Sequence, residues 1–230
     1  RQGRAMNYHF DWTPIWAARG LIGEGLLLTI ALSAASLALS TIIGLIVGGA
    51  ATAHSRTVRA CALFFTETMR NIPLLIHMYI WYMAFSFLRL PAFSCAVLGL
   101  SLYSGAYVAE VVRAGIGSVG RGQMQAALAT GLTGLQAMRY IIYPQALRII
   151  APSLASLFSQ LIKDSSLASV IAVGELTYQA GAIDGQTFRT FEVYITISLI
   201  YLVLVTAASQ LVLLIPGARN EAAVGRFADA

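Results

Sequence analysis

The sequence predicts an all-α integral membrane protein, with five membrane-spanning helices and one loop built of short helices. Of the 230 residues, 58% are hydrophobic and only 11% are charged. A soluble domain usually carries about 25% charged residues, because it needs them to cover its surface. The apolar residues also gather in runs of ~20 residues or more, the length that an α-helix needs to cross a bilayer. Arginines lie in the sequence between these runs.

Five segments meet this length criterion for a spanning helix. They cover residues 21–51, 60–88, 93–115, 147–173 and 192–215. Pro216 and Gly217 end the last segment, since neither residue favours the continuation of a helix. We therefore expect one transmembrane domain over residues 21–216, preceded by an interfacial segment over residues 1–20 and followed by a polar tail over residues 217–230.

Two patterns predict close packing inside the bundle. Gly44 and Gly48 form a G-x-x-x-G motif in the first segment, and small residues at this spacing let two helices approach closely. Cys61 and Cys95 both fall in apolar stretches, which favours two buried thiols over a disulfide. The sequence as a whole shows no internal repeat, so it gives no indication of an inverted-repeat secondary transporter.

The arginines outside the spans predict the orientation of the chain, because positively charged residues favour the cytoplasmic side of a membrane. One side carries seven of them: Arg56, Arg59, Arg121, Arg139, Arg148, Arg219 and Arg226. The other side carries five: Arg1, Arg4, Arg19, Arg89 and Arg189. We therefore expect the N-terminus outside and the C-terminus in the cytoplasm. Residues 8–20 are rich in aromatic side chains, with Trp16 at helical spacing, and are expected to form a short helix in the outer interface.

Ionisable side chains inside the second, third and fourth segments need an explanation. They are Glu67, Arg70, Glu110, Arg113, Lys163 and Asp164. Each charge would cost about 2.5–3.5 kcal/mol at the centre of a bilayer, so six unpaired charges are not expected to face lipid. The first four form two acid–base pairs three residues apart, a spacing that puts both members on one helix face. One interpretation is therefore that they lock the bundle as ion pairs, or lie near the ends of spans.

The other interpretation is that some of these charges line a wet path for a charged or zwitterionic solute. Pro73 follows Arg70 closely, and a proline within a span leaves a backbone carbonyl that needs a partner or water. Ser165 and Ser166 add two hydroxyls beside the last pair of charges. Both signs of charge together with hydroxyl donors suit an α-amino acid better than an ion, a sugar or a lipid. The six charges and the two serines are the candidate pathway residues.

The sequence carries no motif for catalysis. A phosphate-binding loop of the form G-x-x-x-x-G-K-[ST] needs a lysine, and the only lysine is Lys163, preceded by SQLI. His9, His54 and His77 have no ligand spacing, so no metal site is expected. The net charge of +5 comes from arginines between apolar segments, a distribution that indicates membrane orientation and no nucleic-acid partner. We expect no enzyme activity and no cofactor in this chain, and energy must come from another subunit or an ion gradient.

Residues 122–146, GQMQAALATGLTGLQAMRYIIYPQA, are not a membrane span, because Gly131 and Pro144 interrupt them. Ala126 and Ala127 combine high helix propensity with little bulk. Such a turn can lie in a groove of another protein, so the segment is interpreted as a docking element at the membrane surface. The alternative is an interfacial segment that packs only against its own bundle.

This segment resembles the cytoplasmic loop of ABC importer permeases, which is written E-A-A-x(3)-G-x(9)-I-x-L-P. The corresponding residues are Gln125, Ala126, Ala127, Gly131, Ile141, Tyr143 and Pro144, with every spacing kept. Gln125 stands where the family has Glu, and Tyr143 stands where it has Leu. Gln keeps the length and hydrogen bonding of Glu but loses its charge. Further stretches resemble the polar amino-acid branch, the histidine/glutamine/glutamate permease type: RNIPLL, GAYVAEVVRAGI, PQALRIIAPSL, LIKDSSLASVI and TFRTFEVY.

The resemblance implies the fold of a type I ABC importer permease in a bacterial inner membrane, with five spans and a cytoplasmic coupling helix in residues 117–146. It implies two ABC ATPase subunits that bind ATP and Mg, a second permease (identical or a paralogue) and an extracytoplasmic solute-binding protein. The residues that it places against the ATPase are Gln125, Ala126, Ala127, Gly131 and Pro144. The implied function is the import of polar or charged amino acids by alternating access. A gradient-driven carrier or channel for a small zwitterionic solute is the alternative.

Overall fold

The computed structural model describes residues 8–213, and these residues form helices joined by short turns, with no strand. The helices are α1 (Thr13–Ala17), α2 (Arg19–Ala50), α3 (Arg56–Asn71), α4 (Leu74–Tyr79), η1 (Ile80–Ala84), η2 (Ser86–Leu88), α5 (Ala92–Ser118), α6 (Arg121–Ala129), α7 (Gly134–Ala137), η3 (Met138–Ile142), α8 (Tyr143–Asp164), η4 (Ser165–Ile171), α9 (Leu176–Thr187) and α10 (Thr190–Leu213). The prediction of an all-α protein is therefore confirmed.

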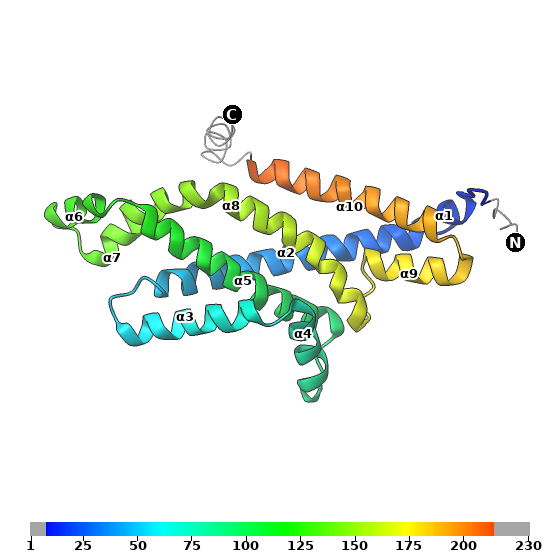
Figure 1. Cartoon of the computed structure of the whole chain (residues 1–230), viewed down its shortest axis with the longest axis horizontal. Coiled ribbons are helices and arrows are strands. Elements are labelled where there is room, and N and C mark those ends of the chain that lie inside the picture. Colours follow the sequence, from blue (N-terminus) through cyan, green and yellow to red (C-terminus); the bar gives the residue numbers. More distant parts are fainter. Residues whose placement is uncertain (1–7, 214–230) are drawn as a thin grey trace, which may run out of the picture.

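Four stretches are long and apolar enough to cross a membrane. They are α2, α5, the helical stretch Gly134–Ile171 that contains α8, and α10 up to Gln210. These helices run along the long axis of the molecule, with α6 and α7 at one end and α1 and α9 at the other (Figure 1). The first, third, fourth and fifth expected segments thus have the predicted character. The polar tail, the first two arginines and the last two arginines of the sequence lie outside the described residues.

The second expected segment, residues 60–88, is not one continuous helix, and no helix within it meets the length criterion for a span. α3 ends at Asn71, Ile72 is extended, and α4 begins at Leu74. Pro73 is the cause, because proline has no N–H for the helical ladder and disfavours the helical conformation of the residue before it. The chain turns at this break, so that α4, η1 and η2 project sideways from the bundle as an arm (Figure 1).

The backbone at this break keeps its hydrogen bonding through a side chain. In a continuous helix the carbonyl of Met69 would accept from the N–H of residue 73, which Pro73 lacks. The Nε2 atom of His77 lies 3.0 Å from the Met69 carbonyl oxygen and donates to it instead. His77 is buried and packs edge-on against the ring of Tyr103 on α5, with 6.0 Å between the ring centroids.

α3 is amphipathic and buries only a narrow face. Ala62 and Thr66 are buried, whereas Phe64 is 74% exposed on the opposite face. Cys61 is exposed as well, which corrects the prediction of two buried thiols; Cys95, on α5, is buried as expected. Cys61 lies three residues before Phe64 and shares its outer face of the helix, so the apolar character of the segment did not indicate burial.

Glycines bring α2 and α5 into close contact, as the G-x-x-x-G motif predicted. A Cβ atom on Gly44 would overlap the side chain of Val108. A Cβ atom on Gly48 would lie 2.6 Å from the carbonyl oxygen of Ala109 and 2.7 Å from the Cβ atom of Val112. Both distances are too short for real side-chain contacts, so only glycine permits this approach of the two backbones.

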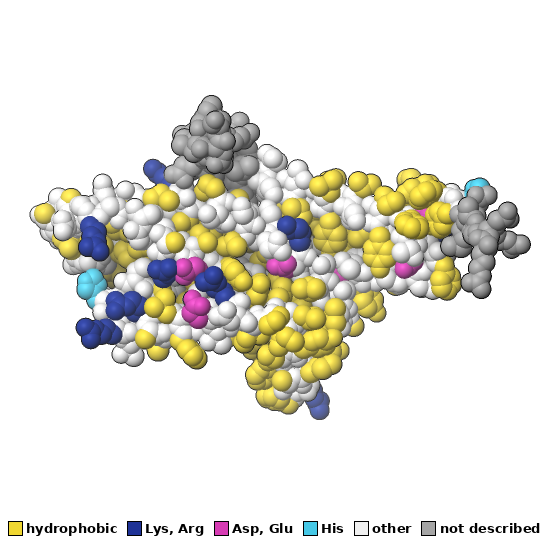
Figure 2. All heavy atoms as spheres, viewed as in Figure 1, with side chains coloured by type: hydrophobic (Ala, Val, Ile, Leu, Met, Phe, Trp, Pro, Cys, Tyr) yellow, Lys and Arg dark blue, Asp and Glu magenta, His cyan; other side chains and the backbone are white. Residues whose placement is uncertain are grey.

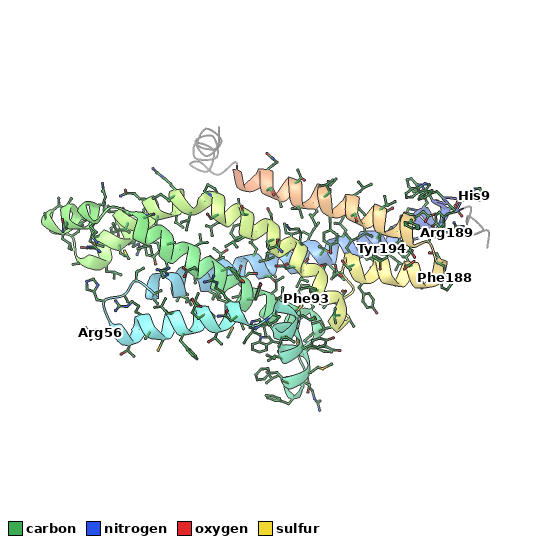
Figure 3. The ribbon with its side chains drawn as sticks, in the orientation of Figure 1. His9, Arg56, Phe93, Phe188, Arg189 and Tyr194 are labelled. Atoms are coloured by element: carbon green, nitrogen blue, oxygen red, sulfur yellow. The ribbon has the colours of Figure 1, made fainter. Side chains whose placement is uncertain are left out.

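The end of the molecule that holds α1 is tied to α10 by a buried acid. Glu192 is fully buried and accepts hydrogen bonds from the hydroxyl of Tyr8 and from the backbone N–H of Asp11, the latter at 2.9 Å. Arg189 donates to the carbonyl oxygen of His9 at 2.8 Å, and both residues lie at this end in Figure 3. The hydrogen bond to Glu192 raises the pKa of the Tyr8 phenol, so its hydroxyl remains a donor.

Candidate functional site

Arg70, in the last turn of α3, has hydrogen-bond donors to spare. Its Nη1 atom lies 3.9 Å from a carboxylate oxygen of Glu67, and the Glu67 side chain is 65% exposed. The guanidinium lies over the ring of Tyr107 on α5, 5.1 Å from the ring centroid. The Nε atom of Arg70 is buried and has no hydrogen-bond partner among residues 8–213. Because a guanidinium has five N–H donors in a planar fork, Arg70 can still bind a carboxylate bidentately.

The second predicted pair is much tighter. Arg113 donates from Nη2 and Nε to the two carboxylate oxygens of Glu110, at 2.6 Å and 3.0 Å. Both side chains are partly exposed, 41% for Arg113 and 30% for Glu110. This bidentate geometry satisfies both groups at once. The pair therefore has less capacity for a ligand than Glu67 and Arg70.

Two tyrosines connect these charges along one face of α5, and the sequence analysis did not identify them. Tyr103 and Tyr107 are four residues apart, and Glu110 follows three residues later, so all three share a helix face. The hydroxyl of Tyr103 donates to that of Tyr107 at 3.4 Å. Figure 2 shows positive and negative side chains gathered over α3 and α5 on the face in view. The helical spacing of the tyrosines with Glu110 was the signal that could have revealed this polar stripe.

The last group of candidates consists of Lys163, Asp164, Ser165 and Ser166. Among the described residues, Lys163 and Asp164 make no salt bridge with each other; Asp164 instead accepts a hydrogen bond from Gln160 at 2.7 Å. Ser165 is buried, and its hydroxyl donates to the carbonyl oxygen of Ile162 at 2.7 Å. The hydroxyl therefore satisfies a backbone acceptor in the last turn of α8. Lys163 is exposed and Ser166 half-buried.

Glu175 is a fully buried acid that the sequence analysis also missed. Its carboxylate caps α9 by accepting from the backbone N–H groups of Thr177 and Tyr178 at 2.9 Å and 2.8 Å. It also accepts from the hydroxyl of Tyr201 on α10 at 2.8 Å. These hydrogen bonds compensate for burying the carboxylate and attach α9 to α10.

The loop that resembles the docking segment folds as α6, α7 and η3 at the end of the molecule opposite α1 (Figure 1). Gln125 and Ala126 are exposed on α6, whereas Ala127 is buried. Gly131 has φ +87°, a left-handed conformation that favours glycine. It lies just after the C-terminal end of α6, where the chain turns towards α7. Pro144 is the second residue of α8, directly after the π-helical turn η3, within the continuous helical stretch Gly134–Ile171.

The same loop closes over a groove with a volume of about 1480 Å³ at this end of the bundle. Side chains and backbone from α2, α5, α6, α7, η3 and α8 line it, among them Ile46, Gly49, Ile116, Met124, Leu135 and Tyr143. Leu135, the first side chain of α7, is 81% exposed, and Leu128 on α6 is 48% exposed. Two exposed leucines beside small residues give the loop an apolar outer surface.

The fold and the loop together define a class of protein. The chain belongs to the family of binding-protein-dependent transport system inner membrane components, whose sequence profile matches residues 18–218. The family that the loop motif indicated is thereby confirmed. The fold is that of type I ABC importer permeases. The chain is a membrane-spanning transport subunit and not an enzyme; ATP hydrolysis in this family belongs to a separate ATPase.

Individual relatives place the chain within that family. It is 38% identical over 204 residues to the glutamine transport system permease protein of Escherichia coli (strain K12), which covers 87% of this chain and 93% of that protein. It is 34% identical over 209 residues to the glutamate/aspartate import permease protein of the same strain, covering 84% and 85% of the two chains.

Solved structures agree with this assignment. The crystal structure of an amino acid ABC transporter with histidines has 34% identity to this chain and a TM-score of 0.82, and covers 92% of this chain and 99% of that one. A methionine ABC transporter in an inward-facing conformation has a TM-score of 0.71 at 20% identity, covering 85% of this chain and 96% of that one. The second likeness supports the fold alone.

Proposed function

We propose that this chain carries polar or charged amino acids across the bacterial inner membrane by alternating access, powered by a separate ABC ATPase. The similar proteins named for glutamine and for glutamate/aspartate import support this substrate class. The observation that carries the proposal is the loosely held pair of Glu67 and Arg70, 3.9 Å apart, beside the Tyr107 ring. The Arg70 guanidinium has N–H groups that are free to donate, and the Glu67 carboxylate is accessible. Together they match the carboxylate and the ammonium group of an α-amino acid.

In this proposal the substrate separates the weak pair. Its α-carboxylate binds bidentately to Arg70, and its ammonium group binds to Glu67, so that each charge exchanges a poor partner for a better one. Asp164 and Lys163, which do not pair with each other, offer further charges for a polar side chain. Glu110 and Arg113 remain bound to each other, at 2.6 Å, and hold the shape of the pathway.

The docking surface for the ATPase is formed by α6 and α7. Gln125 and Ala126 are exposed there, and Leu128 and Leu135 supply apolar contact area. The motif Gln125, Ala126, Ala127, Gly131 and Pro144 covers this same loop. ATP and Mg would bind on the ATPase subunits, two of which would sit beneath a pair of permeases.

A second permease, identical or a paralogue, would cover the charged face. The face carries the partly exposed side chains of Arg70, Glu110 and Arg113, and lipid does not tolerate such charges. In the neighbouring arm, η1 and η2 depart from α-helical geometry, and irregular backbone at membrane depth needs protein or water around it. Phe87 is 72% exposed on that arm and would supply apolar contact with the second chain.

The proposed orientation puts the loop end in the cytoplasm and the α1 end outside. Five arginines flank the loop end within the described residues: Arg56, Arg59, Arg121, Arg139 and Arg148. At the α1 end, the charge of Arg189 is offset by Asp11 and Glu192, at 3.8 Å and 3.7 Å. Within the described residues, these five arginines stand against Arg19, Arg89 and Arg189 on the proposed outer side, and the excess favours the cytoplasm for the loop end. An extracytoplasmic solute-binding protein would deliver the substrate at the α1 end.

Uptake into proteoliposomes tests the function directly. The permease is reconstituted with its ATPase subunits, a solute-binding protein is supplied outside, and uptake of labelled glutamine, glutamate and histidine is measured with and without enclosed ATP. We expect uptake that requires ATP and persists when an ionophore collapses the ion gradients. Uptake that is the same with and without ATP, and that stops when the ionophore is added, would instead support a gradient-driven carrier and overturn the proposal.

A further inference from the structure

We propose that Tyr143 is a positioning residue that connects the docking loop to the cytoplasmic end of α2 through Gly49. The inference rests on the proposed function, because it concerns how movement of the loop reaches the spans. Tyr143 stands where the loop motif of the family has Leu, a side chain that has no hydroxyl to donate. It would make α2 respond directly to the ATPase.

The contact itself is close and polar. The hydroxyl of Tyr143, the first residue of α8, lies 3.5 Å from the carbonyl oxygen of Leu45 on α2 and can donate to it. A Cβ atom built on Gly49 would overlap this hydroxyl, and would lie 3.4 Å from the Cζ atom of the ring. The tyrosine therefore fits against α2 only because residue 49 has no side chain.

Within residues 8–213, nothing other than Tyr143 requires a glycine at position 49. It is the penultimate residue of α2, and its φ is not in the left-handed region. A glycine within a helix is destabilising by about 1 kcal/mol relative to alanine. The Tyr143 hydroxyl is the nearest atom that an added Cβ would meet, so space for this side chain explains the glycine.

The end of α2 thereby contacts two elements at once. Gly48 packs against Ala109 and Val112 on α5, while its neighbour Gly49 packs against Tyr143. Tyr143 follows η3 without a break, so a displacement of the loop moves its ring together with the start of α8. The ring then pushes on α2, and the glycine contacts pass the displacement from α2 to α5.

A reciprocal pair of substitutions tests this contact in the complete transporter. Gly49→Ala places a methyl group on the hydroxyl, whereas Tyr143→Phe removes the hydroxyl and leaves only the 3.4 Å ring contact. The measured quantity is the number of amino-acid molecules transported per ATP hydrolysed. We expect Gly49→Ala to lower this ratio about tenfold, as an overpacked contact would. Tyr143→Phe should lower it less, by about twofold, because it loses only one weak hydrogen bond. The double variant should perform at least as well as Tyr143→Phe.

Gly117→Ala is the matched control. Gly117 is the penultimate residue of α5 and lines the same groove, but a Cβ atom there meets nothing within 4 Å. This variant should keep the wild-type ratio. The proposal is overturned if Gly49→Ala behaves like Gly117→Ala, or if the double variant is no better than Gly49→Ala.

The melting temperatures of the same variants separate this proposal from the proposed function. The contact predicts that Gly49→Ala melts below the wild type and that adding Tyr143→Phe raises it again. If the wild-type assembly showed no ATP-driven uptake, the transport function would be wrong, and these melting temperatures would still decide whether the contact exists. A Gly49→Ala variant that melts like the wild type would overturn it.

Discussion

The imidazole of His77 donates a hydrogen bond to the carbonyl oxygen of Met69, the acceptor that Pro73 leaves without its helical partner. One side chain thus repairs the backbone at the point where α3 ends and the arm of α4, η1 and η2 turns away. The repair is internal to the described chain, because the ring is only 4% exposed. It lets the helix break within the bundle without leaving a buried carbonyl unpaired.

Replacing His77 by phenylalanine should therefore destabilise the permease by about 1–3 kcal/mol, the cost of a buried polar group that loses its partner. Phenylalanine keeps the ring but cannot donate. His77→Gln is the control, because its amide can donate to the Met69 carbonyl. Denaturant unfolding in detergent micelles measures both variants. Equal losses for the two substitutions would show that the hydrogen bond is not what stabilises the break.

Arg70→Lys should lower amino-acid uptake about tenfold or more. Lysine keeps the positive charge but cannot form two parallel hydrogen bonds to a carboxylate, and one charge-assisted hydrogen bond contributes about 1.5–3 kcal/mol. Initial uptake rates over a range of substrate concentrations, at equal amounts of protein in the membrane, measure the effect. The control is Arg113→Lys, the same change in the neighbouring tight pair, which should reduce uptake less. If Arg113→Lys is the more damaging of the two, the assignment of Arg70 is wrong.

Glu110 and Arg113 should behave as a structural pair. Glu110→Gln or Arg113→Gln alone leaves one partly buried charge without its partner, at a cost of about 1.5–3 kcal/mol. The double substitution removes both charges, so its cost should be smaller than the sum of the single costs by at least about 0.5 kcal/mol. A double-mutant cycle on the stability of the purified permease measures this difference. Strict additivity would mean that the two side chains do not stabilise each other.

The predictable part of the fold is the part that depends on local pattern. Hydropathy and length identified α2, α5, α8 and α10, because a span needs only continuous apolar sequence. The same criterion failed for residues 60–88, since an average over the segment does not register that Pro73 ends the helix. Pro73 was noted as a source of a free carbonyl, but the partner of that carbonyl, His77, is set by the geometry of the turn.

The candidate site was predictable in the same limited sense. Spacing of three residues correctly paired Glu67 with Arg70 and Glu110 with Arg113. Spacing does not determine which pair is tight, because the position of Arg70 depends on Tyr107 from another helix. Lys163 and Asp164 are adjacent in sequence, and adjacent residues on a helix point in different directions, so they do not pair.

Tryptophan fluorescence can test whether the α1 end lies in the membrane interface. The chain has three tryptophans, and Trp16 on α1 is 71% exposed. Phe188 and Phe191, at the same end of the bundle, are 83% and 60% exposed. Exposed aromatic rings of this kind favour the headgroup region of a bilayer. In a variant that keeps Trp16 as the sole tryptophan, lipids brominated near the headgroup should quench the fluorescence more than lipids brominated near the chain ends.

A variant that keeps only Trp81 provides the comparison. Trp81 lies on η1 and packs against Phe85, with 4.9 Å between the ring centroids. Because the proposed second permease would cover this arm, both kinds of brominated lipid should quench Trp81 weakly in the assembled transporter. Stronger quenching of Trp16 by the deeply brominated lipid would place α1 inside the hydrocarbon and contradict an interfacial helix. Strong quenching of Trp81 would show that the arm faces lipid, which would contradict the proposal that a second chain covers the arm.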